Sequence, residues 1–64
     1  MAWKDAKLYA KEWLSAKNLP ADLTGQTFDL VEMGTSLECQ GAFRVMVLRA
    51  AARELRHRGA KLKM

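Results

Sequence analysis

The stretch that decides the fold is GAFRVMVLRAAARELRHR, residues 41–58. Its first half is apolar apart from Arg44, and its second half carries arginines spaced among alanines and leucines. Alanine, leucine and arginine favour helix, and arginines in the last turns oppose the negative end of the helix dipole. The pattern predicts one long helix over 36–58 that begins in the core and ends as a basic surface.

An amphipathic helix is predicted over 2–17, because apolar residues recur there every three or four positions. Asn18 suits the left-handed conformation that ends a helix, and Pro20 prevents the helix from continuing. The predicted apolar stripe consists of Trp3, Ala6, Ala10, Trp13 and Leu14.

Residues 21–40 fit two structures. The first is a short helix over 24–33 that Gly34 closes, followed by a capping box at residues 35–38 that opens the long helix. The second is a β-hairpin with arms 27–33 and 36–40, in which Gly41 would be the true start of the long helix. In the hairpin Glu32 would face apolar neighbours, and a lone two-stranded hairpin is marginally stable. We therefore expect the helical arrangement.

The expected fold is a single small all-α domain, residues 1–64, with three helices over 2–17, 24–33 and 36–58. Residues 59–64 are expected to form a frayed basic tail. The alternative fold class is α+β, in the order α-β-β-α with a central hairpin. The predicted core consists of Trp3, Ala6, Ala10, Trp13, Leu14, Leu30, Val45, Leu48, Ala52 and Leu55.

Charge is distributed unevenly along the chain. The net charge is +4, with +2 in the first 20 residues, −4 in the next 20 and +6 in the last 24. Such a distribution favours anionic partners at one end of the molecule. Cys39 is the single cysteine, so an internal disulfide is excluded. With no signal segment and no apolar run long enough to span a bilayer, we expect a cytoplasmic protein without a membrane partner.

No group of residues indicates catalysis. His57 is the single histidine and lies among arginines, with no serine or cysteine nearby in the sequence to activate. The acidic residues between positions 29 and 38 lack the spacing of a metal site, and the four glycines are too scattered for a phosphate-binding loop. We expect a non-enzymatic protein with no catalytic residues, metal, cofactor or small-molecule substrate.

Residues 26–45 resemble the helix-turn-helix motif, with a short helix, a tight turn at residues 33–36 and a longer helix. The resemblance implies that the second helix enters a DNA groove. The sequence departs from the motif at Leu30, where crossing helices need a small residue, and at Asp29 and Gln40, where the motif has apolar side chains. Glu38 would also bring a carboxylate toward the phosphates. These departures indicate that any nucleic acid is bound by a surface other than the groove-reading face of a helix-turn-helix motif.

The expected function is therefore binding and regulation, with nucleic acid bound through the basic end of the long helix. The predicted nucleic-acid-binding residues are Arg49, Arg53, Arg56, Arg58, Lys61 and Lys63. The alternative is a regulator, inhibitor or adaptor that docks on a larger protein through surplus apolar surface, with an acidic patch on the partner. The predicted interface residues are Phe43, Met46, Val47 and Ala50, and they also lead us to expect a homodimer. The sequence leaves open whether the partner is DNA, RNA or protein.

Overall fold

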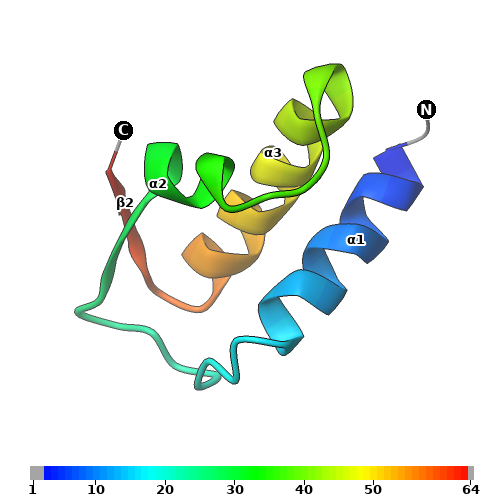
Figure 1. Cartoon of the computed structure of the whole chain (residues 1–64). Helices are drawn as coiled ribbons and strands as arrows, with labels where there is room; N and C mark the ends of the chain where they lie inside the picture. Colours follow the sequence, from blue (N-terminus) through cyan, green and yellow to red (C-terminus); the bar gives the residue numbers. More distant parts are fainter. Residues whose placement is uncertain (1–2, 64) are drawn as a thin grey trace.

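The computed structural model describes residues 3–63, and within them it contains three helices and a two-stranded parallel sheet (Figure 1). The described chain is 59% helical, so the predicted helical character is confirmed, whereas the all-α class is only partly right. Residues 2 and 64, at the ends of the predicted first helix and tail, lie outside the described residues. The elements are α1 (Trp3–Ser15), β1 (Thr27–Asp29), α2 (Leu30–Thr35), α3 (Gly41–His57) and β2 (Lys61–Lys63).

Helix α1 lies beside α3, and the two form most of the core (Figure 1). Ala6 and Ala10 are 0% and 2% exposed, and their small side chains allow the two helices to approach closely. Asn18 has a φ of +54°, as predicted for the residue that ends the first helical segment. The buried apolar residues of the described chain are Ala6, Ala10, Leu14, Leu23, Leu37, Val47, Ala50, Ala51, Ala52, Leu55 and Ala60.

The buried face of α3 differs from the predicted one. Val45 was predicted in the core but is 54% exposed, whereas Val47 was assigned to surplus surface and is 0% exposed. The reason is that α1 covers the side of α3 that carries Ala50, while α2 approaches Leu48 from another side. Leu30 is also only partly buried, at the edge of this arrangement.

The predicted helix over 24–33 is wrong in its position. Residues 27–29 are strand β1, and α2 begins after Asp29, whose Oδ1 accepts hydrogen bonds from the amides of Val31 (2.9 Å) and Glu32 (3.2 Å). An aspartate in this place satisfies amides at the helix start that have no partner within the helix. Gly34 lies inside α2 and is buried, because Leu48 of α3 approaches it closely.

The predicted capping box at residues 35–38 is also wrong. Ser36 ends α2, and its hydroxyl donates to the Met33 carbonyl oxygen at 2.8 Å. Helix α3 begins only at Gly41, after Gln40, which makes no side-chain capping bond. Between the two helices the chain is held by Leu37, which is 4% exposed and packs in the core.

The predicted frayed tail is wrong, since residues 61–63 form strand β2. This strand pairs in parallel with β1, with Phe28 opposite Leu62. Helix α3 ends at His57, close to the predicted end at residue 58, and the Leu23 amide donates to the Arg58 carbonyl oxygen at 2.8 Å where the chain turns. The alternative central hairpin is wrong as well, because β1 pairs with the end of the chain and residues 36–40 form no strand.

Candidate anion-binding surface

Three of the predicted nucleic-acid-binding residues lie on one face of α3. Arg49, Arg53 and Arg56 are exposed, and they follow one another at four- and three-residue spacing. Residues at these spacings share one side of a helix. Between Arg49 and Arg56 the helix rises about 10 Å. We call these three side chains the arginine row.

The arginine row borders an apolar groove between α2 and α3. Val31 and Val45 are 66% and 54% exposed in this groove, which is unusual for large apolar side chains with two helices nearby. No acidic side chain is among the described residues that line it. The lining residues are Trp3, Leu30, Val31, Val45, Leu48, Arg49, Ala52, Arg53 and Arg56.

The other three predicted nucleic-acid-binding residues lie elsewhere. Arg58 is partly buried, and its Nε donates to Glu54 Oε1 at 3.1 Å, so its charge is already matched within the protein. Lys61 and Lys63 are exposed on β2, in register with Thr27 and Asp29 of β1. The six predicted residues therefore form no single patch.

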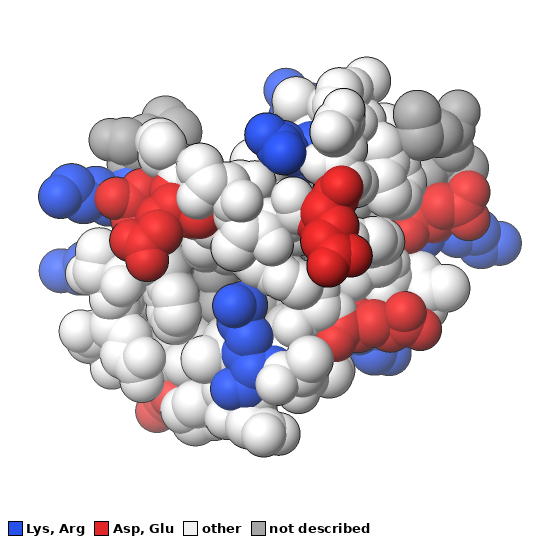
Figure 2. All heavy atoms as spheres, in the orientation of Figure 1, with Lys and Arg blue, Asp and Glu red and all other residues white. Residues whose placement is uncertain are grey.

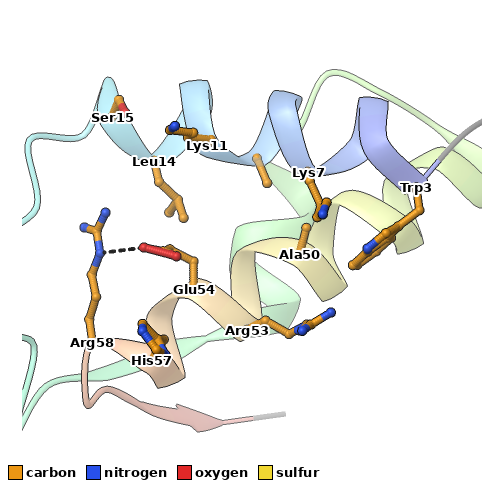
Figure 3. Close-up of a pocket in the computed structure, with 11 residues that line it drawn as sticks. Trp3, Lys7, Lys11, Leu14, Ser15, Ala50, Arg53, Glu54, His57 and Arg58 are labelled. Atoms are coloured by element: carbon orange, nitrogen blue, oxygen red, sulfur yellow. Dashed lines mark hydrogen bonds and ion pairs between the residues drawn. The ribbon is translucent and has the colours of Figure 1, made fainter.

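A second hollow, which sequence reasoning missed, lies between α1 and α3 and has a volume of about 540 Å³. In Figure 3 the side chains of Trp3, Lys7 and Leu14 extend from α1 toward α3. We call this hollow the α1/α3 cleft. Its lining residues are Trp3, Lys7, Ala10, Lys11, Leu14, Ser15, Ala50, Arg53, Glu54, His57 and Arg58.

Arg53 lines the cleft as well as the groove, and its guanidinium carbon lies 6.0 Å from the centre of the Trp3 ring. A guanidinium at this distance from an indole is attracted by the electron density of the ring. The two hollows therefore meet at Arg53 and Trp3.

The predicted protein-binding face needs correction. Val47 and Ala50 are buried inside the single chain, so neither is available to a partner in this fold. Phe43 and Met46 are partly buried against the core, and the Phe43 ring meets the Tyr9 ring edge to face at 5.7 Å. The surplus apolar surface inferred from the sequence is instead found at Val31 and Val45.

The surface charge is more mixed than the sequence segments suggest. Figure 2 shows one face of the molecule, on which acidic and basic side chains alternate with uncharged ones. The acidic middle segment of the chain is folded against the basic last segment, as the pairing of β1 with β2 demonstrates. Basic side chains are therefore grouped only in local clusters, at the arginine row and in the α1/α3 cleft.

Two ionisable groups have clearly shifted pKa values. Loss of solvent contact raises the pKa of Tyr9, and the nearby Cys39 and Glu38 raise it further. Hydrogen bonds from the hydroxyl and then the amide of Thr24 lower the pKa of Asp22. Neither group lines the cleft or the groove.

Within residues 3–63, no group of three or more histidine, cysteine or acidic side chains could hold a metal ion. No helix in that same range is long and apolar enough to cross a membrane.

Comparison of the chain with protein-family models, with curated proteins and with solved structures gave no match.

Proposed function

We propose that this chain is a small non-enzymatic binding protein that binds nucleic acid through the arginine row on α3. The observation that carries the proposal is the exposure of Arg49, Arg53 and Arg56 on one helix face, beside a groove whose described lining contains no carboxylate. Each guanidinium offers a planar set of donors that matches a phosphate group.

The expected strength of this contact follows from counterion release. Three phosphate contacts on duplex DNA give a slope of about −2.7 for log K against log salt concentration. Raising the salt from about 50 mM to about 200 mM should then weaken binding about 40-fold. Further phosphate contacts from Lys61 or Lys63 would make the salt dependence of the binding constant steeper.

The test is a titration of the protein with generic duplex DNA at these two salt concentrations. The variant R49E/R56E removes two members of the row, and K4E/K17E is its matched control, because it makes the same change in net charge at two exposed lysines outside the groove. We expect R49E/R56E to abolish binding and K4E/K17E to retain most of it. Equal weakening by the two variants would mean that only total charge matters, and the proposal would be wrong.

A second candidate function is docking of an acidic amphipathic segment from a partner protein. The exposure of Val31 and Val45 favours it, because apolar side chains beside arginines are typical of protein-binding sites. The variant V31S/V45S removes the apolar anchors without changing the charge. It should leave nucleic-acid affinity unchanged if the first proposal is right, and it should weaken a protein complex if the second is right.

The predicted homodimer stays a prediction, as does the absence of enzymatic activity. Val47, one of the predicted interface residues, is completely buried, so a glutamate there would destabilise the fold itself and would not test a dimer. Sedimentation of the wild-type protein and of V31S/V45S is the better measurement, since both valines are exposed.

A further inference from the structure

The α1/α3 cleft gathers basic side chains from two helices that are distant in the sequence. Lys7 and Lys11 are exposed and four residues apart, so they project from the same side of α1. Arg53 and His57 have the same spacing on α3 and line the opposite wall. Along each helix the two positions are about 6 Å apart.

The positive charge of this cleft is incompletely matched within the protein. Among the described residues that line it, Glu54 is the one acidic side chain, and it is hydrogen-bonded to Arg58. The one carboxylate offsets one positive charge, and Lys7, Lys11 and Arg53 leave the lining of the cleft with an excess of positive charge. Like charges held near one another favour the binding of an anion between them.

We propose that a backbone phosphate of the bound nucleic acid is held in this cleft by Lys7 and Lys11, so that the nucleic-acid strand crosses from α3 onto α1. This inference rests on the proposed function. It adds α1 to a binding surface that the arginine row alone would confine to α3.

The position of Arg53 connects the groove with the cleft, so a nucleic-acid strand could contact both without a break. Arg53 borders the groove with Arg49 and Arg56, and it borders the cleft with Lys7 and Lys11. Packed helices lie about 8–10 Å apart, which corresponds to roughly three nucleotides of rise along one strand. A strand that contacts the arginine row therefore reaches the lysines of α1 within a few nucleotides.

The experiment compares the salt dependence of DNA binding in K7Q, K11Q, K7Q/K11Q and the control K17Q. Lys17 is an equally exposed lysine just after α1, outside the cleft, with its ammonium 4.5 Å from the Trp13 ring. Each phosphate contact contributes about 0.9 to the salt slope, so loss of the one phosphate held by both lysines should lower the slope of the double variant by about 0.9 and leave that of K17Q nearly unchanged. Circular dichroism should show unchanged folding, because Lys7 and Lys11 are exposed.

A fluorescence reporter makes the location of binding explicit. The chain has two tryptophans, so W13F leaves Trp3, which lines both the cleft and the groove, as the single indole. Addition of DNA should change Trp3 emission in W13F through contacts in the groove and in the cleft, so the change should be smaller in W13F/K7Q/K11Q, where the contacts in the groove remain. An equal change in the two variants would overturn the proposal. An unchanged Trp3 signal at saturating DNA would overturn the proposal.

The remaining outcomes separate this inference from the proposed function. If the wild-type protein shows no salt-dependent DNA binding, the proposed function fails and the inference fails with it. If it binds DNA, but K7Q/K11Q keeps the wild-type slope, only the inference is overturned. Saturable binding of pyrophosphate that requires Lys7 and Lys11, without an effect of these lysines on DNA binding, would show that the cleft serves a free phosphate compound and would also overturn it.

Discussion

The substitution of Gly59 by alanine should destabilise the fold through two separate effects. Gly59 has a φ of +97°, a conformation that residues with a Cβ rarely adopt. A Cβ at this position would also lie 2.7 Å from Thr24 Oγ1, which is too close for two non-bonded heavy atoms. Thr24 cannot move freely, because its hydroxyl donates to Asp22 Oδ1 at 2.6 Å.

The two effects can be given magnitudes. Holding a residue with a side chain at positive φ costs about 1–2 kcal/mol, and forcing an extra carbon into a packed site costs about 1–3 kcal/mol. Gly59→Ala should therefore lose about 2–5 kcal/mol. A chain of 64 residues has a free energy of unfolding of about 3–10 kcal/mol, so this loss is a large share of the total.

Gly25→Ala is the matched control, because Gly25 has a φ of +86° but no heavy atom within 4 Å of its built Cβ. Urea unfolding followed by circular dichroism should give a loss of about 1–2 kcal/mol for Gly25→Ala. In a Thr24→Ala background the extra cost of Gly59→Ala should shrink, since the crowded oxygen is gone. If Gly59→Ala costs no more than Gly25→Ala, the inferred contact with Thr24 is wrong.

Three further outcomes are expected. Asp29→Ala should lower the free energy of unfolding by about 1 kcal/mol, whereas Asp29→Asn keeps a cap oxygen and should be nearly neutral in the same urea assay. The lowered pKa of Asp22 stabilises the fold above about pH 4, and this contribution should disappear as the pH falls through that lowered value. Acid unfolding of Asp22→Asn should lack this component. Leu55→Ala should cost about 2–5 kcal/mol, against less than about 0.5 for Leu8→Ala, because Leu55 is 0% and Leu8 57% exposed.

The parts of the fold that depend on neighbours in the sequence were predictable. Helix α1 has its small and apolar residues at regular helical spacing, and the Asn18 and Pro20 signals that follow it act within a few residues. The predicted end of the long helix at residue 58 also depends on local signals, because Gly59 follows with a positive φ. Where local preference and packing agree, sequence reasoning needs no knowledge of the rest of the chain.

The small sheet could not be predicted from local pattern. Strand β1 has three residues and gains stability only because β2 pairs with it from the other end of the chain. Residues 61–63, Lys-Leu-Lys, alternate as a strand with Leu62 on the buried side, yet such a short segment is also what a frayed tail contains. Asp29 lay inside the predicted helix over 24–33, although an aspartate also suits the start of a helix one residue later.

The distribution of charge in space differs from its distribution in sequence, and this decides where an anion can bind. The +6 of the last 24 residues is divided among Arg44, the arginine row, the Arg58–Glu54 pair and β2, which lies against the acidic β1 segment. Lys7 and Lys11 belong to the modestly charged first segment, yet they line the same cleft as Arg53. A single basic helix would bind an anion even as a peptide, whereas a surface made by α1 and α3 exists only once the core that joins them has formed. The part of the nucleic-acid affinity that the proposed cleft contributes should therefore disappear together with the folded core.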